Sequence, residues 1–178
     1  MTTFSELWSG LRQEGGSAPF LLIDCAGIEG GAARLPHEAL SDLECLFTGD
    51  LADELADVGP YLGRLKSLAP EVRVVAEEAL ANQVALLAIV EDPEDGQPPL
   101  SFAQLHRHLR KFNVVYDPEG KPLYFRYCDP RILVDVLKLL DSKQLDGFFG
   151  PISRLVLVDG RGQVLQLFRQ GGKCVVLG

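Results

Sequence analysis

Metal-binding patterns are missing from this sequence of 178 residues. Its four cysteines are widely separated along the chain, at Cys25, Cys45, Cys128 and Cys174. They form no Cys-x-x-Cys pair, and no spacing between cysteine and histidine matches a zinc site. His106 and His108 stand two positions apart, so on a helix they point in different directions and cannot hold one ion. We therefore expect no metal centre, solvated histidines, and reduced cysteines buried beside apolar residues.

Enzyme signatures are also missing. The chain contains no G-x-S-x-G nucleophile turn, no G-x-G-x-x-G dinucleotide motif and no G-x-x-x-x-G-K-[ST] phosphate loop. Cys128 stands beside Asp129, and a neighbouring carboxylate raises the pKa of a thiol rather than activating it. Nothing singles out a catalytic pair among the 25 acidic residues. We expect a protein that is not an enzyme, with no catalytic residues and no cofactor.

Long apolar stretches are absent as well. The longest run, VALLAIV at 84–90, is far shorter than the ~20 residues that a membrane-spanning helix needs. The N-terminal residues lack the basic start and the apolar stretch of a signal peptide. We expect a cytoplasmic protein without membrane insertion.

Positive charge is scarce in the first part of the chain. The net charge of −8 divides into 5 Lys/Arg against 18 Asp/Glu over residues 1–100, and 12 against 7 over residues 101–178. An acidic total disfavours binding to nucleic acid or to an anionic membrane, because both are polyanions. The basic C-terminal part could still bind an acidic protein partner.

The order of apolar runs predicts one α/β domain over residues 1–178. We expect a mixed, largely antiparallel sheet with flanking helices and a C-terminal β-hairpin extension over 153–178. Short apolar runs bounded by turn residues predict the strands. They are 20–24, 42–47 and 84–91, a hairpin of 114–117 and 122–128, and two strands around Asp159-Gly160, with 173–178 as one more candidate. The segment 59–65 is expected to be extended at its start, because Pro60 biases Gly59 away from helix.

Periodicity and capping residues predict the helices. A short helix is capped by Ser5, a second covers 70–81, a third begins at Ser101, a fourth begins at Asp129-Pro130, and a fifth covers 142–150. In the third helix, Phe102, Leu105, Leu109 and Phe112 form one apolar stripe. Arg107 and Lys111 face away from that stripe, and Arg110 lies toward its flank. The basic face formed by Arg107, Arg110 and Lys111 is a candidate for binding an acidic partner.

The segment LYFRYCDPRIL, at 123–133, contains the densest group of candidate site residues. On the expected strand, Arg126 lies between Tyr124 and Cys128 in apolar surroundings. Such an arginine is tolerated when a carboxylate or several carbonyls satisfy its guanidinium, and either Asp129 or a distant acid could do so. Three interpretations remain open: an Arg–Asp pair that fixes the hairpin to the next helix, a partner-binding site, and catalysis.

Five short motifs follow one another in a distinctive order. They are CLFTG (45–49), GPYL (59–62), HLRKF (108–112), FRYCDPRIL (125–133) and FFGPI (148–152). This order, over roughly residues 20–155, resembles the adaptor-chaperone family that accompanies toxic effectors of the bacterial type VI secretion system. The residues that carry the resemblance as a structural motif are Phe125, Arg126, Asp129, Pro130, Arg131, Gly59, Pro60 and Tyr61.

The resemblance implies a non-enzymatic carrier. Such a protein binds a cognate effector in the producing bacterium, stabilises it and assists its loading onto the VgrG spike protein. Two other classes remain open: an immunity-type protein that binds a toxin, and a small-molecule-binding protein or enzyme.

Overall fold

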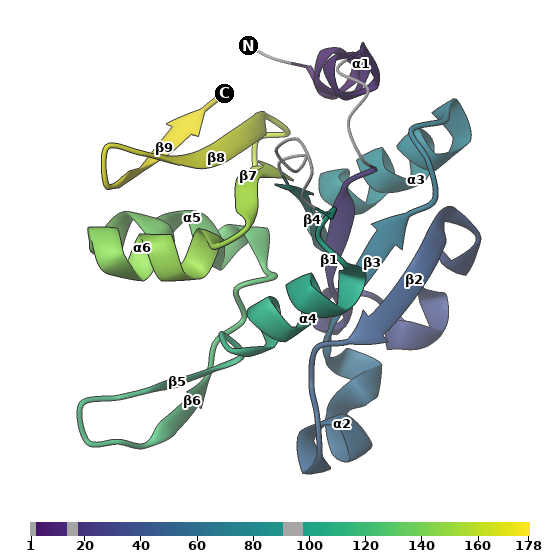
Figure 1. The fold of residues 1–178 in the computed structure, drawn as a ribbon. Coiled ribbons are helices and arrows are strands. Elements are labelled where there is room, and N and C mark those ends of the chain that lie inside the picture. The colour runs from purple at the N-terminus through teal and green to yellow at the C-terminus, as the bar shows by residue number, and fades with distance from the viewer. Residues whose placement is uncertain (1–2, 14–17, 91–97) are drawn as a thin grey trace.

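The computed structural model describes residues 3–13, 18–90 and 98–178 (Figure 1). The strands are β1 (Phe20–Asp24), β2 (Leu40–Cys45), β3 (Pro60–Leu65), β4 (Ala85–Val90), β5 (Val114–Tyr116), β6 (Pro122–Tyr124), β7 (Ile152–Val158), β8 (Val164–Gln170) and β9 (Lys173–Leu177). The α-helices are α1 (Phe4–Gln13), α2 (Asp50–Leu55), α3 (Pro70–Ala81), α4 (Phe102–Arg110), α5 (Pro130–Leu139) and α6 (Ser142–Phe149). Four 3-10 helices lie between β1 and β3: η1 (Cys25–Gly27), η2 (Gly31–Arg34), η3 (His37–Ala39) and η4 (Ala56–Val58).

A seven-stranded sheet organises the molecule, with the strand order β2-β3-β1-β4-β7-β8-β9. Every strand pair in it is antiparallel. The hairpin β5–β6 forms a second, two-stranded sheet and projects away from the body (Figure 1). The expected α/β class with a largely antiparallel sheet, flanking helices and a C-terminal hairpin is confirmed.

Helices cover both faces of the central strands. In β4, Leu87 belongs to the core on the side of α1 and α3, with Trp8 and Leu80. Leu86, the residue before it, has its side chain on the opposite face of the sheet. It belongs to the core on the side of α4, α5 and α6, with Leu105. Because side chains alternate along a strand, an apolar run such as β4 is stable only when it is covered twice. The uninterrupted apolar run over 84–90 is therefore explained by a strand that is covered on both faces.

Capping residues set the helix starts. Ser101 and Gln104 form a capping box at α4, where each side chain bonds the other residue's backbone N–H. In α1, Thr3 performs this role: its Oγ1 accepts from the N–H of Glu6 at 3.2 Å, and Glu6 accepts from the N–H of Thr3 at 2.8 Å. The expectation that Ser5 caps this helix was wrong, because Ser5 already lies inside it.

The second strand of the projecting hairpin is shorter than expected. We predicted a strand to residue 128, but β6 ends at Tyr124. Beyond it the backbone turns twice, with Tyr127 N–H donating to the carbonyl of Phe125 and Asp129 N–H donating to the carbonyl of Arg126. These local bonds direct the chain into α5, so Arg126 lies on a loop.

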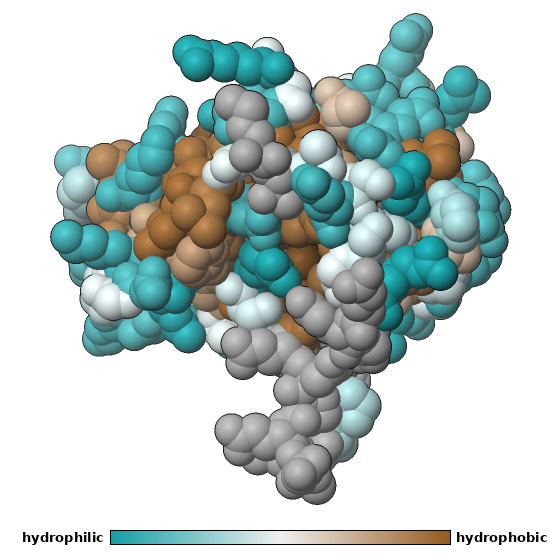
Figure 2. All heavy atoms as spheres, turned by 90° about the horizontal axis from the view of Figure 1, so that it is seen from above, coloured by the Kyte–Doolittle hydropathy of each residue, from teal (hydrophilic) through white to brown (hydrophobic). Residues whose placement is uncertain are grey.

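The strands β7–β9 complete the sheet. β7 pairs with the central strand β4, and β8 and β9 follow outward. Seen from above, hydrophobic residues gather on the side of the molecule where Figure 1 places β8 and β9 (Figure 2). There Phe168 pairs directly with Val175, and Leu177 is 52% exposed. Among the described residues, no helix combines the length and the apolar character needed to cross a membrane.

Candidate functional site

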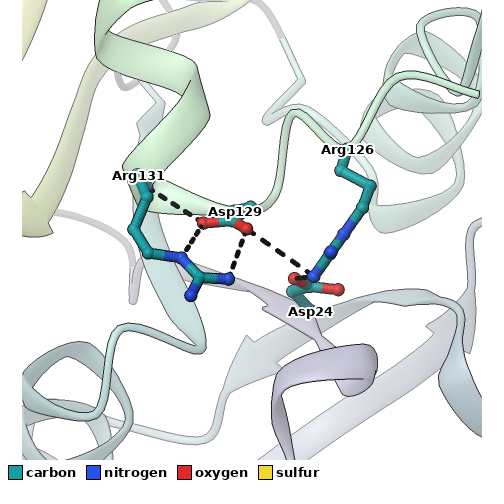
Figure 3. Close-up of polar contacts among 4 residues, drawn as sticks. All are labelled: Asp24, Arg126, Asp129 and Arg131. Carbon is teal, nitrogen blue, oxygen red and sulfur yellow. Dashed lines mark hydrogen bonds and ion pairs between the residues drawn. The ribbon is translucent and has the colours of Figure 1, made fainter.

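Four charged side chains form a cluster where β1 ends and α5 begins (Figure 3). Asp24 is the last residue of β1, and Arg126 lies on the loop before α5. Nη2 of Arg126 lies 2.5 Å from Oδ2 of Asp24 and 3.6 Å from Oδ2 of Asp129. Arg131, in the first turn of α5, binds Asp129 in a bidentate manner, at 2.8 Å through Nε and 2.7 Å through Nη2. The two carboxylates and two guanidiniums therefore form one continuous network.

The acids of this network are buried, whereas the arginines reach the surface. Asp24 is 3% exposed and Asp129 is 1% exposed, but the Arg126 and Arg131 side chains are 33% and 59% exposed. Asp129 also caps α5, because its Oδ1 accepts from the N–H of Arg131 at 3.0 Å. Pro130 occupies the first helical position, where a missing N–H costs nothing.

Electrostatics favour the charged forms of Asp129, Arg126 and Arg131. Burial would raise the pKa of Asp129, but hydrogen bonds from the side chain and backbone of Arg131 outweigh it, with the charges of Arg131 and Arg126 adding to the effect. The pKa of Asp129 is therefore below its usual range. The bond to Asp24 raises the pKa of Arg126, and the bond to Asp129 raises that of Arg131. An ionised carboxylate held by two arginines is a poor proton donor near neutral pH.

Arg126 and Asp24 are 102 residues apart in sequence. The sequence left the partner of Arg126 open between Asp129 and a distant acid, and the structure brings both to it. Asp24 was not singled out from the sequence. The signal that could have found it is its position, since an acidic residue that ends a fully buried strand needs a cation nearby.

The GPYL and CLFTG motifs lie side by side next to this cluster. Pro60 pairs with Asp24 across the sheet, and its carbonyl accepts from the N–H of Leu46 at 2.8 Å. Gly59 is buried against the Phe47 ring, where an added Cβ would lie 2.8 Å from a ring carbon. Tyr61 lies in β3 between Ile23 of β1 and Cys45 of β2. The close approach at Gly59 explains why this position lacks a side chain.

The histidines of α4 are fixed to backbone carbonyls. Nε2 of His106 lies 2.8 Å from the carbonyl oxygen of Cys45, and His106 is 8% exposed. Nε2 of His108 lies 2.8 Å from the carbonyl oxygen of Phe148. The expectation that both are solvated was wrong, because each ring donates to a carbonyl from another element, which a sequence pattern does not reveal. Burial lowers the pKa of His108, and nearby Lys111 lowers it further, while the bond to Phe148 opposes the shift.

The motifs are also joined through aromatic rings and an amide. Phe112 of the HLRKF motif packs edge-on against Phe148 of the FFGPI motif, with ring centroids 5.2 Å apart. Nδ2 of the buried Asn113 donates to the carbonyl of Leu46 at 2.7 Å. Phe125 packs against Tyr127, whose hydroxyl donates to the carbonyl of Leu109. The five motifs that are separate in sequence therefore form one set of contacts.

The basic residues of α4 lie outside this set. Arg107, Arg110 and Lys111 are exposed, and none of them forms an ion pair within the part of the chain that the structure describes. They occupy the last turn of α4 and the residue after it, directly before the β5–β6 hairpin.

Burial acts on the thiol groups of all four cysteines. Burial raises the pKa of Cys25 to about 12 and raises that of Cys128 well above its ordinary value. The thiols are free, and such groups remain protonated at neutral pH. Within the described ranges, no group of three or more His, Cys, Asp or Glu residues could hold a metal ion.

A groove of about 630 Å³ lies elsewhere, between α1, α3 and the β7–β8 turn. Phe4, Val158 and Val164 line it together with Glu77 and Arg161. None of the residues predicted for a site takes part in it.

Comparison with known proteins places the chain in a family. A family described as a domain of unknown function (DUF4123) matches residues 19–147. This range includes four of the five motifs in full. It ends at the residue before the fifth motif, FFGPI at 148–152. No curated protein and no solved structure matches the chain.

Proposed function

The chain belongs to the DUF4123 family, and from this premise we propose that it is a non-enzymatic adaptor-chaperone of a type VI secretion system. It binds a cognate effector in the cytoplasm of the producing bacterium, stabilises it, and assists its loading onto the VgrG spike. The resemblance of the ordered motifs to adaptor-chaperones supports this proposal, because the family match covers most of the same stretch.

The observation that carries the proposal is the distribution of exposed apolar side chains. On the β5–β6 hairpin, Tyr116 is 70% exposed, and Val115, Leu123 and Tyr124 are each 40–46% exposed. On α2 and η4, exposed apolar residues also follow one another: Leu51, Leu55 and Val58. Single exposed apolar residues are ordinary, but groups on projecting elements are typical of protein-binding surfaces.

The use of charged groups fits a binding protein. Asp24 and Asp129 are held by arginines, and His106 and His108 by backbone carbonyls. These side chains connect distant segments of the chain to one another and so have a structural role. Binding would then depend on other residues, at the exposed surface. A carrier needs such a rigid framework, because ordering a flexible surface would oppose association.

Co-expression with the protein encoded by the neighbouring downstream gene tests the proposal. We expect the two proteins to co-purify and to co-elute in size-exclusion chromatography, and the partner to be insoluble when it is expressed alone. Addition of VgrG to the complex should give a ternary species. Two soluble proteins that elute separately would contradict the proposal.

A toxicity assay in the same cells separates a carrier from an immunity protein. A carrier raises the amount of effector without rescuing the cells, whereas an immunity protein suppresses toxicity. Rescue at unchanged effector abundance would therefore assign the chain to the immunity class instead.

A further inference from the structure

The β5–β6 hairpin is built to keep its shape without a partner. Its turn is closed by two backbone bonds, from Asp117 N–H to the carbonyl of Lys121 and from Gly120 N–H to the carbonyl of Asp117. Oδ1 of Asp117 also accepts from the N–H of Lys121 at 2.7 Å. Gly120 has a φ of +81°, a left-handed conformation that glycine adopts without strain.

The base of the hairpin is fixed to the body. Phe125 N–H donates to the carbonyl of Asn113, and Asn113 in turn donates to the carbonyl of Leu46. Tyr124 packs edge-on against Phe47, with ring centroids 5.1 Å apart. The base of the hairpin is therefore attached to Leu46 and Phe47 of the CLFTG motif.

The backbone hydrogen bonds at the two ends of the hairpin also determine which backbone groups face outward. Residues 113 and 125 form one hydrogen-bonded pair, and residues 117 and 121 form another. Because such pairs alternate in an antiparallel ladder, Val115 and Leu123 bond each other, while Val114 and Tyr116 direct their N–H and C=O groups away from β6. Among the described residues, nothing bonds these outward groups.

The two outer edges of the hairpin are not equivalent. On β6 the outward positions are Pro122 and Tyr124, and Pro122 has no N–H to donate. On β5 both outward positions, Val114 and Tyr116, offer a donor and an acceptor. Proline is a common device that blocks the addition of a further strand, so β5 is the edge that is open to one.

The side chains along this edge are apolar, and the charges at its base are positive. Val115 and Tyr116 are 40% and 70% exposed on opposite faces of β5. Arg107, Arg110 and Lys111 lie in the last turn of α4 and the residue after it, shortly before the strand. They are exposed and form no ion pair within the described ranges. A segment that lies along β5 and continues past its start would approach the end of α4, where these cations lie.

We infer that β5 receives an extended segment of the effector as a third strand, with apolar residues over Val115 and Tyr116 and carboxylates facing Arg107, Arg110 and Lys111. This inference rests on the proposed function and names the surface that performs it. Strand addition uses backbone bonds for affinity and alternating side chains for specificity. A third strand also covers apolar surface that a two-stranded hairpin leaves in water.

The variant Tyr116→Pro tests the inference in complexes with the co-expressed downstream gene product. It removes the outward N–H of β5 and keeps every bond between β5 and β6, because the N–H of Tyr116 takes no part in them. Tyr116→Thr is the matched control, since it removes the same ring and retains the N–H. We expect Tyr116→Pro to bind at least about fivefold more weakly than Tyr116→Thr, as the loss of one backbone bond predicts.

Hydrogen exchange at single-residue resolution gives an independent readout. Complex formation should slow exchange at Val114 and Tyr116 and leave Tyr124, on the blocked edge, unchanged. Charge reversal of Arg107, Arg110 and Lys111 to Glu should weaken binding at low salt, when screening is small. The same reversal of the exposed Lys143, Arg161 and Lys173 serves as its control and should have little effect.

The outcomes distinguish the inference from the function on which it rests. If the unaltered chain binds and Tyr116→Pro binds as well as Tyr116→Thr, with no protection at β5, the docking surface is overturned and the adaptor function stands. If the unaltered chain binds nothing, the proposed function fails and the inference fails with it. A homodimer that Tyr116→Pro converts to a monomer would assign the β5 edge to a second copy of this chain and overturn the inference.

Discussion

Arg126 joins two segments that are far apart in the chain. Its guanidinium binds Asp24 at the end of β1 and approaches Asp129 at the start of α5, while both carboxylates are almost fully buried. A buried carboxylate that loses its cation still carries the full free-energy cost of its desolvation. Removing one member of such a pair therefore lowers the free energy of unfolding by more than the net contribution of the intact pair. The role of this side chain is therefore measured best by truncation.

We predict that Arg126→Ala lowers the free energy of unfolding by about 2 kcal/mol. In a chain of this length, that loss corresponds to a decrease in Tm of about 4–8 °C, measured by thermal denaturation. Lys138→Ala is the control, because its pair with Asp135 is exposed and should contribute less than about 1 kcal/mol. A folded Arg126→Ala protein with an unchanged Tm that no longer binds its partner would instead make Arg126 a binding residue.

His108 makes stability depend on pH. Its folded pKa is lowered by burial from the ordinary value of 6.5, so the unfolded chain takes up a proton first as the pH falls. The stabilisation by neutral His108 is therefore fully present above about pH 6.5 and is lost as the pH falls toward the folded pKa. We predict that the Tm advantage of the unaltered protein over His108→Gln is larger at pH 7.5 than at pH 5. An advantage that is constant over this range would contradict the predicted shift.

Local elements were predictable where local chemistry decides them. The helix over 70–81 was predicted with the bounds that α3 has, because Pro70 starts it and its apolar period is regular. The loop that carries Arg126 was not predictable, since aromatic residues favour a strand there and tertiary contacts decide otherwise. The same limit applies to Asp24 and His106, whose partners come from other elements.

The C-terminus of α6 offers a matched pair of glycines. Gly150 has a φ of +49°, and a Cβ there would lie 2.4 Å from Cε1 of His108, whereas a Cβ at Gly147 would meet nothing within 4 Å. We predict that Gly147→Ala, inside the helix, raises stability by about 0.5–1 kcal/mol. Gly150→Ala should lower it by at least about 1 kcal/mol, because it adds backbone strain to a clash. Chemical denaturation measures both changes, and equal effects would refute the assigned role of Gly150.

The whole molecule extends beyond the family match. The match ends at residue 147, but β7 pairs with β4 in the middle of the sheet, and Leu155, Val156 and Leu157 are at most 1% exposed. The sequence suggested a hairpin extension over 153–178. The structure integrates this segment so that its first strand completes both cores, with Val156 on the α3 side and Leu155 on the α6 side.

Truncation separates the contributions of these C-terminal strands. A chain that ends after Gly150 loses the burial of Leu155, Val156 and Leu157, which together stabilise the fold by about 5–9 kcal/mol. A typical domain has a total stability of about 5–15 kcal/mol, so we predict that this chain is insoluble or unfolded. A chain that ends after Gly172 loses only the edge strand β9 and should remain folded with a lower Tm, as judged by circular dichroism. A folded, monomeric protein that ends at Gly150 would show that the segment matched by the family folds independently, and would make β7–β9 an addition to an already complete core.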